Sequence, residues 1–409
     1  MGLENSWKKN LAILWVLQFI GMSAITGVIS FLPLYVPHLG IVNVSTAAMW
    51  SGILMGATSF FAALSNPFWG AMADRNGRKP MVERVLLLFG LIMILMAFAS
   101  NIYQLLFLRI FQGLCGGFTA AATALAISMS PKKEISFTVG MLQTALIVGG
   151  ASGPMIGGLI ADHFGYRQPF VVFGVLCLIA LVVVHFRIQE IFTPVVRAEK
   201  SPIKAVFKYV WSIGDLKLML LVQFLTQFAM QSIGPILPMY ILSLGAGSSN
   251  IASISGTIIA IAGLTSALSS ASMGFLSRHF SHKQILITSA FLGGLSFIGQ
   301  IAATDVISLG ILRALNGLCI GAMVPSSNTI VTYLIPEDKR GAAFGITGGA
   351  SLLGNVLGPT LAGVVTMAFG ITSIFWLTAV FFLFVGTLLL LQIKQNYTAY
   401  EEGKPAVAH

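Results

Sequence analysis

Long stretches without a single charged side chain recur along this chain, and they restrict its possible folds more than any other feature. Such stretches include residues 10–37, 135–161, 218–277, 284–304 and 341–393. A helix of about 20 apolar residues crosses a hydrocarbon core about 30 Å thick. With 56% hydrophobic and 9% charged residues, the chain has more apolar surface than a soluble globule can bury. The sequence therefore predicts an all-α polytopic membrane protein.

Glycine, proline and charged residues divide the chain into about twelve expected spans. These lie near 10–36, 48–73, 83–99, 103–128, 136–161, 167–187, 216–243, 250–276, 284–302, 306–332, 341–365 and 371–393. With the N-terminus in the cytoplasm, Arg109 and Arg313 lie inside spans and Arg167 lies outside. All other Lys and Arg fall in cytoplasmic segments, as the positive-inside rule requires. The net charge of +10 therefore reflects topology, and no nucleic-acid partner is expected.

The chain repeats itself at a nearly constant offset. "FLPLYVPHLG" (31–40) returns as "ILPMYILSLG" (236–245), and "LLFLRIFQGLCGG" (105–117) returns as "LGILRALNGLCIG" (309–321). A duplicated unit with an even number of spans gives two parallel repeats. The expected parts are an N-terminal six-helix half, a cytoplasmic linker with an amphipathic interfacial helix, a C-terminal six-helix half and a cytoplasmic tail. Their ranges are 1–187, 188–215, 216–393 and 394–409.

Four charges crowd into the short loop "GAMADRNGRKP" (70–80) between the second and third spans. Asp74 stands there at the cytoplasmic end of a span, where basic residues alone would satisfy the positive-inside rule. We expect a gating role for Gly70, Asp74, Arg75, Gly77, Arg78 and Lys79, and the alternative is a solvated turn. The second copy, "GFLSRHFSHK", has Arg278 in place of Asp74, so this role belongs to the first repeat.

The fifth span carries small residues in a fixed frame: Gly140, Gly149, Gly153, Pro154, Gly157 and Gly158. Such a stripe lets a neighbouring helix approach closely, and proline adds a bend. The alternative is ordinary small-residue packing. A degenerate copy at Gly345, Gly354, Gly358, Pro359 and Gly363 keeps the same frame.

These motifs resemble the major facilitator superfamily over nearly the whole chain, and the glycine frame resembles the signature of its 12-span drug:proton antiporter branch. The resemblance implies twelve helices in two six-helix parallel repeats that alternate access. It implies a bacterial cytoplasmic (inner) membrane protein with both termini cytoplasmic. It also places the N-terminus of the eleventh span, near 341–345, opposite Asp74. A helix N-terminus attracts a carboxylate, so Asp74 would join the two halves whenever the cytoplasmic side is closed. Arg75 and Arg78 would tether Asp74, with Glu83 or Glu337 as further partners.

Polar side chains inside the spans are the candidate cavity residues: Gln18, Arg109, Gln112, Gln223, Gln227, Gln231, Arg313, Asn316 and Asn355. An arginine at mid-bilayer costs about 2.5–3.5 kcal/mol on insertion scales, so Arg109 and Arg313 are expected to have a use. They are either cavity-facing bases or structural pins that bond helix carbonyls. Gln223, Gln227 and Gln231 share one helical face, and either line a wet cavity or join helices.

No motif for catalysis, nucleotide binding or metal ligation is present, so the sequence predicts neither an enzyme nor a cofactor. The leading hypothesis is a monomeric secondary exporter of small amphipathic drugs, driven by protons and embedded in the lipid bilayer. The alternatives are export of a sugar or other metabolite, and a non-transporting receptor or scaffold. No Asp or Glu lies deep in any span, which removes the usual proton carrier and favours neutral, zwitterionic or anionic substrates over lipophilic cations.

Overall fold

The computed structural model describes residues 6–190, 210–245, 250–336 and 339–393, apart from the side chains of Ser6 and Asp74. Every regular element in these ranges is a helix. Eleven helices are long and apolar enough to cross a membrane, and a bent pair at 52° would make a twelfth. The predicted all-α, multi-span fold is confirmed. Most of the expected linker helix, Glu337 and the tail 394–409 lie outside the described residues.

The chain forms two compact units, Met1–Val196 with Leu237–Ala260, and Arg197–Ile236 with Ile261–His409. The helices of unit 1 are α1 (Ser6–Gly27), α2 (Leu32–Tyr35), α3 (Val44–Asn76), α4 (Arg78–Ala97), α5 (Ile102–Leu114), α6 (Phe118–Met129), α7 (Ile135–Phe164), α8 (Gln168–Arg187), α11 (Leu237–Ser243) and the first half of α12 (Ile251–Ala271). Three short 3-10 helices join them: η1 (Val28–Ser30), η2 (Val36–Leu39) and η3 (Lys132–Glu134).

Unit 2 contains the remaining helices and the second half of α12. They are α10 (Gly214–Ser232), α13 (Met273–His279), α14 (His282–Ile301), α15 (Val306–Leu334), α16 (Arg340–Phe369) and α17 (Ser373–Gln392). Asp305 caps α15 by accepting hydrogen bonds from the backbone N–H groups of Ser308 and Ile307. These bonds, that of Ser308 first, hold the pKa of Asp305 below its usual value.

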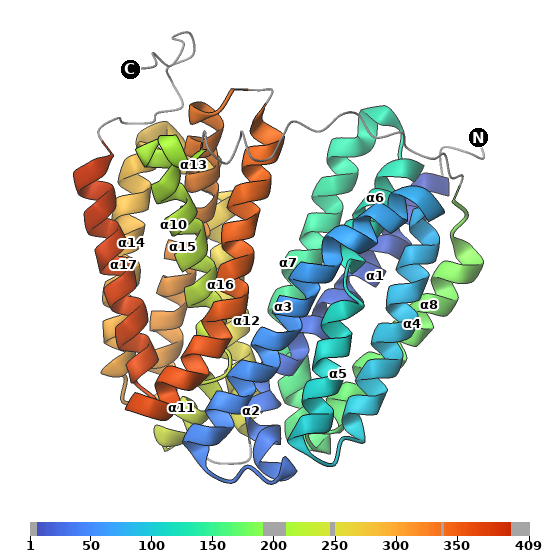
Figure 1. Cartoon of the computed structure of the whole chain (residues 1–409), viewed down its shortest axis with the longest axis horizontal. Helices are drawn as coiled ribbons and strands as arrows, with labels where there is room; N and C mark the ends of the chain where they lie inside the picture. The colour runs from blue at the N-terminus through green and yellow to red at the C-terminus, as the bar shows by residue number, and fades with distance from the viewer. Residues whose placement is uncertain (1–5, 191–209, 246–249, 337–338, 394–409) are drawn as a thin grey trace. The chain divides into compact units, whose positions relative to one another are not determined.

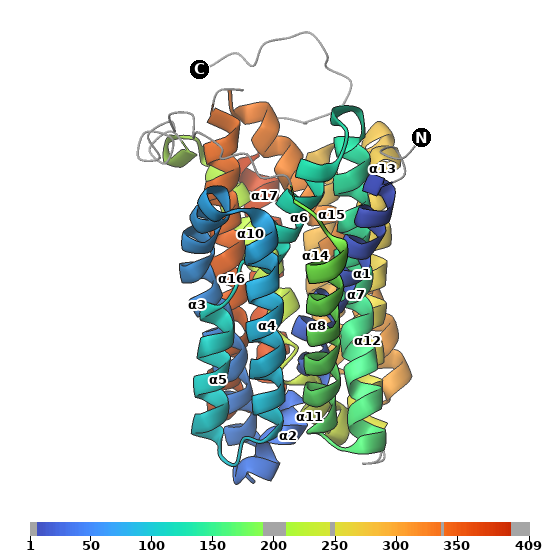
Figure 2. The same ribbon diagram turned by 90° about the vertical axis from the view of Figure 1, so that its right-hand side faces the viewer.

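Equivalent helices pair in both units, as the sequence repeat predicts. In unit 1, α1 packs along α7 and α4 along α8. In unit 2, α10 packs along α16 and α14 along α17 (Figures 1 and 2). The two repeats therefore build their own cores in the same way.

Glycines allow the closest of these helix pairs to form. A Cβ atom on Gly149 would lie 2.7 Å from the carbonyl oxygen of Phe19, and one on Gly354 would lie 2.5 Å from that of Phe224. Neither distance is possible for a real side chain, so only glycine fits there. Because Gly354 is the repeat copy of Gly149, both units rely on the same close contact.

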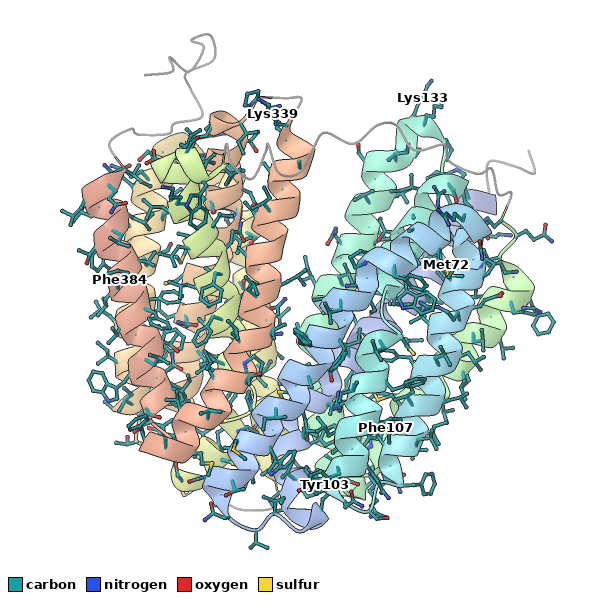
Figure 3. The ribbon with its side chains drawn as sticks, in the orientation of Figure 1. Met72, Tyr103, Phe107, Lys133, Lys339 and Phe384 are labelled. Atoms are coloured by element: carbon teal, nitrogen blue, oxygen red, sulfur yellow. The ribbon has the colours of Figure 1, made fainter. Side chains whose placement is uncertain are left out.

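Large apolar side chains point away from the helices into the surroundings. Phe107 on α5 is 66% exposed and Phe384 on α17 is 56% exposed, and Figure 3 shows both on the periphery. Exposed apolar surface of this extent suits contact with lipid rather than with water.

Two of the expected spans of unit 1 are divided. The predicted first span, 10–36, is α1 followed by η1 and α2. The predicted fourth span, 103–128, is two helices, because α5 ends at Leu114 and α6 begins at Phe118. Gly117 between them has φ +94° and ψ 7°, a left-handed conformation that favours glycine. The copy of this span in unit 2, α15, is continuous.

Candidate functional site

Residues 70–80, here called the signature loop, form the end of α3, a tight turn at Gly77 with φ +97° and the start of α4. The side chain of Asp74 lies outside the described residues, so its expected contact stays a prediction. Its neighbours Arg78 and Lys79 are described, and their backbone N–H groups start α4. Both donate to one carboxylate, that of Glu190, at distances of 2.8–3.0 Å.

Glu190 is a residue that sequence reasoning missed. It follows α8 and lies 112 residues from Arg78 along the chain. Its carboxylate satisfies free N–H groups at a helix N-terminus, where negative charge is stabilising. The only sequence signal was an acidic residue in a basic tract directly after the sixth span. Glu190 thus fixes the loop to the segment after α8, inside unit 1.

A small charge network supports this contact. The Lys79 ammonium lies 3.6 Å from the Glu83 carboxylate and donates to the backbone oxygen of His185 at 2.9 Å. His185 Nδ1 lies 3.2 Å from the same Glu83 carboxylate. Glu83, expected as a further partner in this loop, therefore contacts Lys79 and His185. The loop is tied to the end of α8 at several points.

Arg109 on α5 is 5% exposed, and its Nη1 donates to Gln112 Oε1 at 3.0 Å. Its Nε and Nη2 have no partner among the described residues. Buried donors without partners are costly. No hydrogen bond from Arg109 to a carbonyl of α1 occurs among the described residues, and its use as a cavity-facing base stays a prediction. Gln18 on α1 is fully buried, and neither atom of its amide has a partner in the described part of the chain.

Arg313 occupies the same place in unit 2, also at 5% exposure, with Nε and Nη1 unpartnered among the described residues. The residue three positions later behaves differently. Asn316 donates to Ser296 on α14 at 3.1 Å, whereas Gln112 accepts from its own arginine. The repeats therefore share the buried arginine but not its local partner.

The three glutamines of α10 divide into two kinds. Gln223 is 3% exposed, donates to Asn328 on α15 at 2.8 Å and accepts from Ser351 on α16 at 3.2 Å. Its amide therefore joins three helices. Gln227 and Gln231 are half-buried and rest their Cβ atoms on Gly354 and Gly358 of α16.

Asn355, next to Gly354 on α16, is also half-buried. No hydrogen bond to the amides of Gln227, Gln231 or Asn355 is recorded in the described part of the chain. The structure therefore gathers these three amides around the contact of α10 with α16, where they remain able to bond a ligand.

The glycine frame on α7 faces two neighbours. A Cβ atom on Gly149, Gly153 or Gly157 would meet the backbone of α1, and one on Gly158 would meet the backbone oxygen of Ala252 on α12. A Cβ atom on Gly140 would meet nothing within 4 Å, so the expected smooth face does not include that residue. Ser30 donates to the backbone oxygen of Pro154 at 2.7 Å.

The end of α7 also holds the beginning of α12. The Asp162 carboxylate accepts hydrogen bonds from the backbone N–H groups of Ala252 and Ser253, at 3.3 and 2.7 Å. It also accepts one from the Ser253 hydroxyl. A carboxylate at a helix N-terminus is well placed, and this cap secures the packing of Gly158 against Ala252.

No cluster of three or more potential metal ligands occurs among the described residues. What the geometry does provide is buried amide and guanidinium groups inside helices that span a membrane, in two repeats. This is the class of multi-span membrane transporters.

Comparison with known proteins identifies the family. The model of the Major Facilitator Superfamily matches residues 14–262 and 219–407. Multidrug resistance protein MdtG of Escherichia coli O1:K1 / APEC is 36% identical over 382 residues, which cover 93% of each chain, and MdtG of strain K12 / DH10B matches equally. The chain belongs to the major facilitator superfamily. It is therefore a transporter and not an enzyme, as the sequence predicted.

Solved structures agree on the fold. A bacterial homolog of the human lysosomal transporter Spinster, inward-facing and occupied, superimposes with a TM-score of 0.80 at 16% identity, covering 94% of this chain and 96% of that one. Its unoccupied form gives 0.76 at 15% identity, with the same coverage. At this identity the likeness concerns the fold alone.

Glu190→Ala should destabilise the protein, because two N–H groups of α4 lose their charged acceptor. Loss of a helix cap costs roughly 0.5–2 kcal/mol. We expect a lower thermal unfolding midpoint in detergent. Glu134→Ala is the matched control. It also removes one carboxylate, but the Glu134 side chain makes no hydrogen bond to another described residue. Equal midpoints for the two variants would contradict the role of Glu190.

Gln223→Leu should lower the amount of folded protein, whereas Gln227→Leu should change which compounds are transported. Gln223→Leu strands the polar groups of Asn328 and Ser351, which costs about 1–3 kcal/mol, so less folded protein should reach the membrane. Gln227→Leu should leave the yield unchanged and alter which compounds are transported. Fluorescence-detected gel filtration measures the first effect and a compound panel measures the second. A loss of yield with Gln227→Leu would show that this amide also joins helices.

Proposed function

We propose that the protein exports small amphipathic drugs from the bacterial cytoplasm, driven by proton entry. The observation that carries this proposal is the 36% identity over 93% of the chain to multidrug resistance protein MdtG. The complete glycine and proline frame of α7 supports it, because the antiporter branch that the sequence resembles has this frame. The exporter would lie in the inner membrane as a monomer, with both termini in the cytoplasm.

Alternating access of the two repeats is the proposed cycle. Asp74 would attract the N-terminus of α16 when the cytoplasmic side is closed, because a helix N-terminus carries roughly half a positive charge. The clamp of Glu190 on Arg78 and Lys79 supports this assignment, since it holds the loop that bears Asp74 in one place. Arg278 replaces Asp74 in the second repeat, so only one such contact is expected.

The proposed cavity is polar without acidic side chains. Acidic residues of the described helices lie in their first or last two turns, as Glu83 does in α4 and Asp162 in α7. Gln227, Gln231 and Asn355 offer hydrogen bonds, and Arg109 offers positive charge with two free nitrogens. A lipophilic cation would have no counter-charge there, and an unpaired charge in low dielectric costs several kcal/mol. Neutral, zwitterionic and anionic compounds are therefore the proposed substrates.

Transport in proteoliposomes tests export and its coupling together. An imposed proton gradient should drive compound movement in the wild type, and dissipating the gradient should stop it. Asp74→Asn should insert normally yet transport slowly, because the closed cytoplasmic form loses its charge contact and its population falls. Arg278→Asp serves as the control and should have a much smaller effect. Gradient-independent transport, or normal rates with Asp74→Asn, would refute the coupling or the gate respectively.

Charge selectivity tests the cavity. In a host without its own exporters, the protein should protect against anionic compounds more than against matched lipophilic cations. Arg109→Ala should reduce protection against the anions most. Arg109→Lys should restore it partly, because a point charge lacks the planar guanidinium. Strong protection against ethidium that Arg109→Ala leaves unchanged would rule out this assignment.

A further inference from the structure

The interruption of the fourth span in unit 1 is stabilised by side chains of two other helices. At the end of α5, Ser65 donates to the backbone oxygen of Gly113 at 3.0 Å, and Trp69 Nε1 donates to that of Leu114 at 2.6 Å. Arg84 Nη2 donates to the backbone oxygen of Gly116 at 2.9 Å. In a membrane, a carbonyl freed from a helix needs such a partner. The interruption of the helix is therefore supported by side chains of α3 and α4.

Arg84 and Trp69 also hold each other. The Arg84 guanidinium carbon lies 3.2 Å from the centre of the Trp69 ring, which is a close cation–π contact. Each of the two side chains thus donates to one carbonyl at the interruption, and the two side chains also stack on each other. Together they form a latch, defined here as Arg84 with Trp69, across residues 114–116.

The second repeat lacks both the interruption and the latch. Its copy reads "GLCIG" where the first repeat reads "GLCGG", so Ile320 stands in place of Gly116. Thr288 and Met273 stand at the positions of Arg84 and Trp69. There α15 continues through the equivalent residues and through Pro325 beyond them.

The carbonyls of Leu318 and Gly321 in α15 accept hydrogen bonds from Ser269 and Ser270 of α12, at 2.7 and 2.6 Å. Moreover, a Cβ atom on Gly321 would collide with the backbone oxygen of Ser266. The copy is therefore a continuous helix packed tightly on its neighbour.

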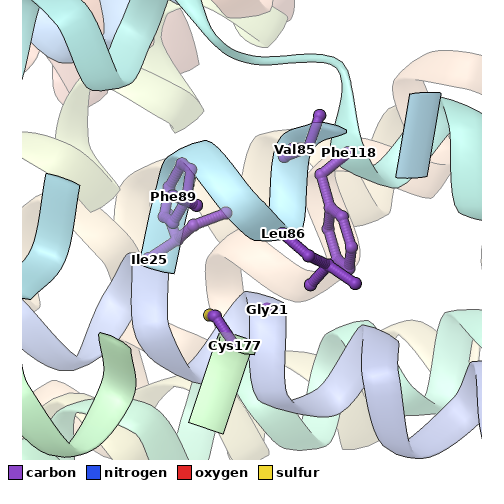
Figure 4. Close-up of a pocket in the computed structure, with 7 residues that line it drawn as sticks. All are labelled: Gly21, Ile25, Val85, Leu86, Phe89, Phe118 and Cys177. Atoms are coloured by element: carbon purple, nitrogen blue, oxygen red, sulfur yellow. The ribbon is translucent and has the colours of Figure 1, made fainter. Parts of the chain in front are cut away.

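The first residue of α6 packs against α1. A Cβ atom on Gly21 of α1 would collide with the ring of Phe118, so the ring rests directly on this glycine. Figure 4 shows Phe118 beside Leu86 of α4, with Gly21 and Cys177 nearby. These residues line a small apolar pocket at the N-terminus of α6.

We propose that residues 115–117 are a working hinge, that the fourth span of the first repeat alternates between a bent and a straight form, and that Arg84 and Trp69 latch the bent form. The hinge separates the Arg109 and Gln112 pair on α5 from Phe118 on α6. It also connects to the signature loop, because Arg84 and the turn held by Glu190 belong to the same helix, α4. The inference goes beyond the proposed export activity and does not depend on the compound transported.

Distances between paired spin labels test the hinge in the full-length protein in lipid nanodiscs. Labels carried by unnatural amino acids at Phe107 and Ser128, both exposed, report the angle between α5 and α6 and leave the native cysteines in place. We expect two distances in the wild type, the shorter one from the bent form. The equivalent pair in the second repeat, Ile311 and Thr332, should give one distance because α15 is continuous.

Gly117→Ala should shift the first pair to the longer distance. A left-handed backbone is disfavoured for alanine, and the population ratio should change about 5- to 30-fold towards the straight form. Gly40→Ala controls for the backbone strain alone, because Gly40 has nearly the same backbone angles, φ +97° and ψ 4°, and no atom within 4 Å of an added Cβ, whereas a Cβ atom on Gly117 would also lie 3.1 Å from Cβ of Trp69. It should leave the distances unchanged. An equal response to both substitutions would overturn the hinge.

The latch is tested independently of the glycine. Arg84→Gln should shift the population in the same direction as Gly117→Ala. Arg84→Lys should shift it much less, because an ammonium can still bond the Gly116 carbonyl and face the Trp69 ring. A single wild-type distance that neither Arg84 variant alters would overturn the proposal. Since the measurement needs no transported compound, that result would leave the proposed export untouched.

Discussion

Most features of this structure follow from the absence of water in the bilayer core, where each backbone polar group needs a partner inside the protein. Regular helices meet this requirement by themselves, so the chain is helical wherever it is apolar. Where a helix is interrupted, a side chain replaces the lost partner. At the end of α5, Trp69 bonds the carbonyl of Leu114 and Arg84 bonds that of Gly116.

The same constraint makes α4 a mechanical link. Its first turn is held by Glu190, and Arg84, one to two turns later, bonds the interrupted fourth span. A helix whose internal hydrogen bonds are complete moves as a rigid body. In the proposed hinge, a displacement of the turn at Gly77 would reach the carbonyl of Gly116 through this short segment of α4.

The sequence predicted the fold well because its evidence is local and repeated. Apolar runs mark the spans, and the recurrence of "FLPLYV" and of the glycine frame marks the two repeats. The contacts of the site were harder to predict. Glu190 binds residues far away in the chain, and Gln223 is separated by more than a hundred residues from Asn328. Their pairing depends on the way the helices pack, which no single stretch encodes.

Two further failures have different causes. The glycine frame continues to Gly140, but the helix contact does not, because a small side chain permits close approach without supplying a neighbour. The interruption of the fourth span lies where Gly116 stands in place of the Ile320 of the second repeat, and donors on other helices bond its carbonyls. The similarity of the two repeats predicts a continuous helix in both. The interruption in the first repeat became evident only from the structure, where Arg84 bonds the carbonyl of Gly116.

The division of polar groups between the repeats has a physical consequence. The first repeat carries the charged loop, the clamp of Glu190 and a span that can bend, whereas the second carries a continuous span and the amides of Gln227 and Gln231. A flexible recognition surface would pay an ordering cost at each binding event. If Gln227 and Gln231 bind the transported compound as proposed, their place on the tightly packed contact of α10 with α16 avoids that cost. The proposed hinge at residues 115–117 then lies in the other repeat, together with the signature loop and the latch.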